Sequence, residues 1–170
     1  EQELKEFLEK SGIPAASTLL GLSALPSDHP QYVGMLGMHG NYAPNIKNRD
    51  CDLLIAIGMR FDDRVTSDIS KFAPNAKHIV HVDIDPAEIG KNVVTDFPLV
   101  ADSIDFLEAL YEQLQQCNHA DWVEEVNANR YEVQSPVGSV LPPKETFAFI
   151  DQCVDDETIV ATDVGQHQMW

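Results

Sequence analysis

Basic residues and long apolar runs are scarce in this 170-residue sequence, and each shortage excludes a class of protein. Eleven lysines and arginines stand against 28 aspartates and glutamates, which gives a formal net charge of −17 at pH 7. Because such a charge repels phosphate backbones and anionic membrane surfaces, we expect no nucleic-acid partner and no membrane partner. No apolar run approaches the roughly 20 residues that a membrane-spanning helix needs.

Cysteine is also scarce, and its spacing predicts neither disulfides nor a metal site. Cys51, Cys117 and Cys153 are odd in number, far apart and free of any CxxC pattern. Free thiols of this kind are typical of a reducing cytosol. The first ten residues, EQELKEFLEK, lack the basic and then apolar layout of a signal peptide. We therefore expect a cytoplasmic protein.

Short apolar runs that alternate with helical patterns predict an α/β fold. Buried strands are expected within residues 52–58, 77–85 and 98–102, and a shorter strand with a turn within 14–22. Helices are expected over residues 2–10, in the second half of 35–50, after the N-cap Asp102 with Phe106, Leu107, Leu110 and Leu114 on one face, and over 118–133. Continuous apolar strands between helices favour a doubly wound parallel sheet with helices on both faces.

The same patterns divide the chain into three parts. Residues 1–117 predict one doubly wound α/β domain that begins on a helix, so its opening strand is expected to be missing. Residues 118–143 predict a polar helix and a linker, QSPVGSVLPP. Residues 144–170 predict a helix and then a buried strand, TIVA, that presents GQHQ at its tip. We expect a piece of a larger protein, truncated at both ends.

Two glycine- and arginine-rich segments follow predicted strands or turns, where open α/β sheets bind ligands. In GMLGMHG, Gly34, Gly37 and Gly40 recur every three residues, which suits either a tight structural loop or a backbone cradle for a phosphate. The pattern is not GxGxxG, so an ordinary Rossmann NAD site is not supported. A single histidine beside glycines, His39, does not distinguish the two interpretations.

Charged residues follow the next two strands. In RFDDRV, Arg60 and Arg64 flank two aspartates and form either a local ion-pair cluster or a grip on a diphosphate, with the aspartates orienting the arginines or accepting from a ribose hydroxyl. Asp83 ends a strand, where a carboxylate can accept hydrogen bonds from ribose or adenine. A metal on Asp83 and Asp85 would lack a third oxygen ligand nearby. Together these signals predict a bound nucleotide.

Four motifs carry a resemblance that covers nearly the whole chain. MLGMHGNYAPN, IGMRFDDRVT, HVDIDPAEIGKN and TDVGQHQMW resemble, in order and spacing, the catalytic large-subunit family of acetolactate synthase, also called acetohydroxyacid synthase. Members of this family have a pyrimidine-binding, a central FAD-binding and a diphosphate-binding domain. The resemblance implies that residues 1–117 are the central FAD-binding domain and that 144–170 begin the thiamine-diphosphate-binding domain.

The resemblance also implies a set of cofactor contacts. Gln166 and His167 would approach thiamine diphosphate. Ser67 and Ala101 stand where the family usually has glycine, which puts local loop geometry in doubt. The implied FAD contacts are Thr18, Leu19, Leu36, Gly37, Met38, His39, Gly58, Met59, Arg60, Phe61, Asp62, Asp83, Ile84, Asp102 and Ser103.

The activity that the resemblance implies depends on thiamine diphosphate, Mg²⁺ and FAD. Family members decarboxylate pyruvate and join the product to pyruvate or 2-oxobutyrate, which gives 2-acetolactate or 2-aceto-2-hydroxybutyrate for valine, leucine and isoleucine biosynthesis. They form homodimers or tetramers, with a regulatory small subunit. The resemblance places the thiamine-activating glutamate and the Mg²⁺ ligands outside this chain, so we expect no catalytic residue, no metal ligand and no activity of residues 1–170 alone.

Two other functions fit the same residues. The strand-end segments would serve a non-catalytic adenine-dinucleotide-binding module equally well, although such a module has no need for VGQHQMW. A different thiamine-diphosphate-dependent decarboxylase or oxidase, with a redox-active flavin, would share the architecture. Product analysis separates carboligation from oxidation.

Overall fold

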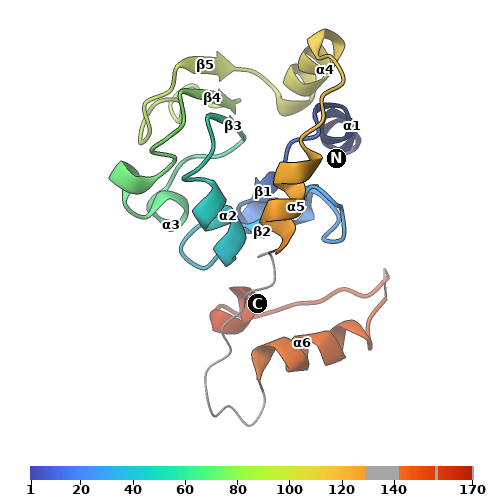
Figure 1. Ribbon diagram of the computed structural model, residues 1–170. Coiled ribbons are helices and arrows are strands. Elements are labelled where there is room, and N and C mark those ends of the chain that lie inside the picture. Colours follow the sequence, from blue (N-terminus) through green and yellow to red (C-terminus); the bar gives the residue numbers. More distant parts are fainter. Residues whose placement is uncertain (129–141, 156, 170) are drawn as a thin grey trace. The chain divides into compact units, whose positions relative to one another are not determined.

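The computed structural model describes residues 1–128, 142–155 and 157–169. It divides into two units, Glu1–Tyr131 and Glu132–Trp170, and the first holds the sheets (Figure 1). Most of the predicted linker, residues 134–141, lies outside the described residues.

Parallel strands form two sheets in the first unit. β1 (Ala15–Ser17) pairs with β2 (Tyr32–Met35), and β4 (His78–Asp83) lies between β3 (Leu53–Ile57) and β5 (Phe97–Val100). Every pair is parallel, so the carboxyl ends of the strands within each sheet gather at one edge. The predicted α/β class is confirmed, with its strands divided between two sheets.

Four helices of the first unit, α1, α2, α4 and α5, fall close to their predicted places, and residues 129–133 of the last predicted helix lie outside the described residues. α3 and the two 3₁₀ helices of this unit were not predicted. Gly12 ends α1 in the left-handed conformation, with its N–H bonded to the Leu8 carbonyl. Asp102 caps α4 by accepting from the Ile104 N–H, as predicted. The bounds are α1 Gln2–Ser11, α2 Tyr42–Lys47, α3 Asp63–Thr66, α4 Ser103–Gln113 and α5 Ala120–Ala128, with the 3₁₀ helices η1 Leu19–Ala24 and η2 Ile69–Lys71.

One face of the sheets is covered by α1 and α4, which lie side by side (Figure 1). Phe7 and Leu8 of α1 and Leu107 of α4 are buried in one apolar cluster. Ile55 and Ile57 of β3 pack against the same cluster, so it contacts both sheets through β3 and the buried Tyr32 of β2.

Alternate residues of β3 point to the opposite face, as the pleat of a strand requires. Ala56 belongs to a second buried cluster with Phe61 and Phe72, and Leu54 packs against it. A third cluster joins Val33 of β2 to α2 and α5. The first two clusters give β3 an apolar neighbourhood on each face.

Two features of the first unit differ from the sequence predictions. β2 was not predicted, because YVGM is short and lies within a glycine-rich stretch, yet all four of its residues are buried. The strands after it are less buried than their apolar runs predict: Leu53 of β3 is exposed, and so is every residue of β5. β3 and β5 border the second sheet, where fewer neighbours cover their side chains.

The second unit contains α6 (Pro143–Asp151) and η3 (Gln166–Met169). The predicted helix is present, but the predicted strand at residues 158–161 is wrong, because the segment pairs with no other strand in the described structure. Ile159 is 94% exposed. A β-branched run becomes a strand only when another strand accepts its hydrogen bonds, and its propensity alone does not supply one.

Among the described residues, none of the helices combines the length and the apolar character needed to cross a bilayer.

Replacing Leu8 with alanine should destabilise the first unit. Leu8 is 1% exposed in the cluster between α1 and α4, so its truncation leaves a cavity and should cost about 2–5 kcal/mol of unfolding free energy. Urea unfolding followed by circular dichroism measures the loss. Leu20→Ala is the control, because Leu20 is 90% exposed and its truncation should change stability by less than about 0.5 kcal/mol. Equal losses in the two variants would contradict this packing.

The three thiols should react at different rates with a disulfide reagent. Cys117 and Cys153 are exposed, whereas Cys51 is buried and donates its S–H to the Asn48 carbonyl. Burial raises the pKa of the Cys51 thiol, so less thiolate is available at a given pH. In Ellman titration of the native chain we expect two fast thiols and one slow thiol. Cys51→Ala should remove the slow phase alone, and three equal rates would refute the assignment.

Candidate functional site

The predicted FAD residues lie at or just beyond the carboxyl ends of the five strands. Open α/β sheets bind ligands at this edge, where the loops gather. Thr18 and Leu19 follow β1, residues 36–39 follow β2, residues 58–62 follow β3, Asp83 and Ile84 lie at the end of β4, and Asp102 and Ser103 follow β5.

Backbone hydrogen bonds connect the first three of these loops. The Leu36 N–H donates to the Ser17 carbonyl at 2.8 Å, which joins the ends of β1 and β2. The Met38 N–H donates to the Arg64 carbonyl at 2.7 Å, which joins the loop after β2 to the segment after β3. The carboxyl ends of the two sheets therefore meet in one region.

The ends of the second sheet are connected in the same way. The Gly58 N–H donates to the Val82 carbonyl at 2.8 Å, and the Ala101 N–H donates to the Asp83 carbonyl at 3.2 Å. These bonds continue the ladder beyond the last residues of β3 and β5. The loops that carry the arginine, the buried aspartate and the helix cap are thus neighbours.

The glycine loop after β2 is tightly closed. Gly37 has φ 113°, and a Cβ there would lie 2.5 Å from the Arg64 carbonyl oxygen, so only glycine fits this approach. Asn45 accepts from the Gly37 N–H and donates to the Gly37 carbonyl, at 3.0 and 2.9 Å. Asn41 accepts from the Met35 N–H at 2.8 Å. Two asparagine side chains therefore hold the loop.

The backbone N–H groups of this loop distinguish its two interpretations. The N–H groups of Gly37 and Met38 bond to Asn45 and Arg64, and the N–H of Gly40 bonds to the Gly37 carbonyl. A phosphate cradle needs several free N–H groups that point at the ligand. The geometry favours the tight structural loop, in which the exposed side chains of Met38 and His39 are the surface offered to a ligand.

The arginine loop, residues 58–62, has two residues in the left-handed region, Gly58 at φ 61° and Phe61 at φ 52°. Phe61 is buried in the second apolar cluster, which holds this unusual conformation in place. The side chain of Arg60, between them, is 63% exposed. The loop therefore anchors an aromatic ring inside and presents a guanidinium outside.

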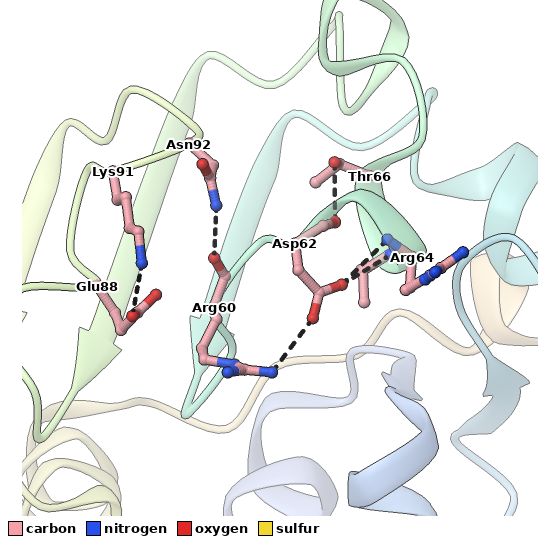
Figure 2. A network of polar contacts seen from close by, with 8 residues as sticks. Arg60, Asp62, Arg64, Thr66, Glu88, Lys91 and Asn92 are labelled. Carbon is pink, nitrogen blue, oxygen red and sulfur yellow. Dashed lines mark hydrogen bonds and ion pairs between the residues drawn. The ribbon is translucent and has the colours of Figure 1, made fainter.

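Asp62 pairs with Arg60 in the loop and caps the following helix (Figure 2). Its Oδ1 accepts from the N–H groups of Arg64 and Val65, at 3.1 and 3.2 Å, and so caps α3. Its Oδ2 lies 3.5 Å from Nη2 of Arg60. Of the ion-pair cluster that RFDDRV allows, the described residues contain one pair, between Arg60 and Asp62, and Arg64 makes no ion pair among them. The alternative, a grip on a diphosphate, stays a prediction.

The carboxylates at the ends of β4 and β5 each use one oxygen for the protein backbone. Oδ1 of the buried Asp83 accepts from the Asp85 N–H at 2.8 Å, and Oδ1 of Asp102 accepts from the Ile104 N–H at 2.8 Å. Within the described part of the chain, Oδ2 of each accepts no hydrogen bond. Each aspartate can therefore accept one more donor, such as a ribose hydroxyl or an adenine amine.

The remaining predicted cofactor residues belong to the second unit. Gln166 and His167 lie in η3, where His167 is exposed and the side chain of Gln166 is outside the described structure. The described residues contain no group of three or more histidine, cysteine, aspartate or glutamate side chains placed to bind a metal ion.

Four side chains that shape the site were not predicted. Asn41 and Asn45 close the glycine loop, His81 bonds the carbonyl of Met59, and Asn92 Nδ2 donates to the Arg60 carbonyl at 3.3 Å (Figure 2). The four-residue spacing of the two asparagines, directly after a glycine-rich turn, was a usable signal. His81 and Asn92 carry no local pattern, because each bonds a residue more than twenty positions away.

Comparison with known proteins assigns the chain to a family. Residues 1–110 match the family described as "Thiamine pyrophosphate enzyme, central domain", thiamine pyrophosphate being thiamine diphosphate. The acetolactate synthase large subunit of Lactococcus lactis is 42% identical over 98% of this chain and 29% of its own length. Acetolactate synthase 1, chloroplastic, of Oryza sativa is 44% identical over 99% and 27%, and the isozyme 2 large subunit of Escherichia coli 43% over 98% and 30%.

These matches extend over both units of the chain. The chain spans about 30% of the length of the curated relatives it matches. The similarity that four motifs predicted is confirmed at above 40% identity. The chain belongs to the thiamine pyrophosphate enzymes and carries, over residues 1–110, the central domain of that family.

Proposed function

We propose that this chain is the central part of an acetolactate synthase large subunit and that it holds FAD at the carboxyl ends of β1–β5. The observation that carries the proposal is the similarity to acetolactate synthases over 98–99% of the chain. The relatives' names favour this function over another thiamine-dependent decarboxylase or oxidase, and over a non-catalytic dinucleotide-binding module.

The residues present fit FAD by their chemistry. The exposed guanidinium of Arg60 suits the diphosphate, since a forked donor matches two phosphate oxygens. The open oxygens of Asp83 and Asp102 suit hydroxyl and amine donors of the ribose and adenine. Met38 and Ile84, both exposed, offer apolar surface to a ring. FAD would contribute a structural element here, without net redox change.

The expected opening strand belongs to the same proposal. Gly58 N–H and the Asp52 carbonyl bond toward β4, so alternation directs the backbone groups of Leu53, Ile55 and Ile57 to the other edge of β3. That edge pairs with no strand among the described residues. In the doubly wound order 3-2-1-4-5-6, one strand lies between the positions that β1 and β3 occupy here. We place the missing strand there.

The reaction of the whole enzyme is proposed from the family. Thiamine diphosphate with Mg²⁺ supplies the carbanion chemistry, in which pyruvate is decarboxylated and joined to pyruvate or 2-oxobutyrate. This chain contributes binding surface: FAD contacts in the first unit, and Gln166 and His167 toward thiamine diphosphate in the second. The word "large subunit" in the relatives' names supports a small-subunit partner, within a homodimer or tetramer. Cytoplasmic location stays a prediction, since the rice relative is named chloroplastic.

Replacing Arg60 with alanine should weaken FAD binding. Loss of a charge-assisted contact to the diphosphate should raise the Kd for FAD about tenfold. Quenching of flavin fluorescence on titration of the purified chain measures Kd. Arg49→Ala is the matched control, because Arg49 is an exposed arginine outside the loops at the strand ends and should leave Kd unchanged. Equal Kd values in both variants would contradict the assigned contact. A wild-type chain that does not bind FAD would mean that the site requires the missing strand.

A chimeric enzyme tests the proposed activity. Residues 1–170 replace the matching segment of the Escherichia coli isozyme 2 large subunit, to which they are 43% identical. We expect the chimera, with thiamine diphosphate, Mg²⁺ and FAD, to convert pyruvate to acetolactate in a colorimetric acetoin assay. The isolated chain should form none. The chimera carrying Arg60→Ala should need about tenfold more FAD for half-maximal activity. A folded, FAD-loaded chimera without acetolactate formation would contradict the assignment.

A further inference from the structure

We propose that His81 is the positioning residue of the arginine loop, residues 58–62: it holds the Met59 carbonyl and thereby fixes how Arg60 is presented. This inference rests on the proposed function, in which Arg60 contacts the diphosphate of FAD. His81 itself touches no ligand in this scheme.

The position of His81 gives it one backbone partner in the loop. The side chain is fully buried in β4, at 0% exposure, and Nε2 lies 2.7 Å from the Met59 carbonyl oxygen. Because a carbonyl oxygen only accepts, Nε2 carries the proton and donates it. The bond connects the centre of β4 to a residue 22 positions earlier, directly beside Arg60.

The same ring supports the strained residue of the loop. Its centroid lies 4.7 Å from the ring of Phe61, in an edge-to-face arrangement with an interplanar angle of 77°. Phe61 has φ 52°, which a non-glycine residue adopts rarely and keeps only where its surroundings enforce it. His81 therefore holds the loop on both sides of Arg60, through the carbonyl of Met59 and the ring of Phe61.

The other ring nitrogen shows that His81 is not the best choice for folding alone. Nδ1 is buried and has no hydrogen-bond partner among the described residues. An unpaired buried nitrogen destabilises the folded state, and an apolar side chain of similar size would avoid that cost. The hydrogen bond from Nε2 to the Met59 carbonyl explains why a histidine with an unpaired Nδ1 occupies this fully buried position.

The outer end of the loop is held independently. Asn92 Nδ2 donates to the Arg60 carbonyl at 3.3 Å, and Asp62 caps α3 (Figure 2). The peptide between Met59 and Arg60 is thus fixed by His81 at one carbonyl, and the peptide after Arg60 by Asn92 at the next. With both peptides fixed, the backbone and the Cα–Cβ direction of Arg60 are fixed, so only the side chain remains to be ordered when a diphosphate binds.

The test compares His81→Leu and His81→Gln with Val82→Ala. Leucine removes the donor, whereas the glutamine amide can still donate to the Met59 carbonyl. Val82 is the neighbouring residue, 1% exposed, and its truncation weakens the same strand without removing a side-chain bond to the loop. The three variants are compared at a single temperature, at which their thermal unfolding curves show equal folded fractions.

Two measurements separate positioning from general stability. The first is the Kd for FAD by flavin fluorescence. The second is the rate of tryptic cleavage after Arg60 in the FAD-free chain, identified by mass spectrometry of the fragments. For His81→Leu we expect about a tenfold higher Kd and cleavage several times faster than in Val82→Ala. His81→Gln should recover most of both values.

Each outcome decides the proposal. If His81→Leu and Val82→Ala show the same Kd and cleavage rate at equal folded fraction, His81 is a core residue only and the proposal is overturned. If the wild-type chain does not bind FAD, the proposal that residues 1–170 hold FAD by themselves fails, yet the cleavage rates still decide whether His81 fixes the loop. Should His81→Leu not fold, His81→Asn replaces it: its amide is one methylene shorter than that of glutamine, so cleavage as slow as in His81→Gln would overturn the proposal.

Discussion

The hydrogen bond from the Met38 N–H to the Arg64 carbonyl is the contact on which the candidate site depends. It joins the loop after β2, in the first sheet, to the segment after β3, in the second. The bond requires glycine at position 37, because a Cβ there would meet the Arg64 carbonyl and Val65. The absence of one side chain thus lets two sheets that share no strand pairing bring their carboxyl ends together.

Most polar residues of the motifs stabilise the loops and also present groups to a ligand. Asp62 and Asp102 each cap a helix with one oxygen, and Asn45 closes the glycine loop with its amide. Such bonds replace flexible backbone with fixed backbone, so a ligand that binds there meets loops already close to their bound shape. The cost is that few backbone N–H groups remain for phosphate.

The sequence predicts the fold where one local pattern decides it and fails where distant partners decide. α1 follows from the spacing of Leu4, Phe7 and Leu8, and the start of α4 from the capping residue Asp102. The strand-end loops follow from the rule that parallel strands gather their carboxyl ends. β2 is not predicted, because a run of four buried residues that includes a glycine carries no periodicity. The strand predicted at residues 158–161 is wrong, because β propensity does not provide a pairing partner. His81 was missed for the same reason, since its partner is distant along the chain.

The charge of the chain would leave the arginines at the strand ends, Arg60 and Arg64, the latter unpaired among the described residues, a decisive part in binding a diphosphate. With a net charge of −17, the surface as a whole repels an anion, but screening confines each charge to about 8 Å at physiological salt. The groups in direct contact with the ligand therefore decide whether an anion binds. The glycine loop offers few free N–H groups, and the nearby Lys91 is already ion-paired to Glu88 at 2.8 Å. Arg60 has only a longer, exposed pair with Asp62 at 3.5 Å, which is worth little and is readily exchanged for phosphate oxygens. The weakness of that pair, together with the rigid peptides on each side of it, makes this arginine available to an anionic ligand on an otherwise acidic protein.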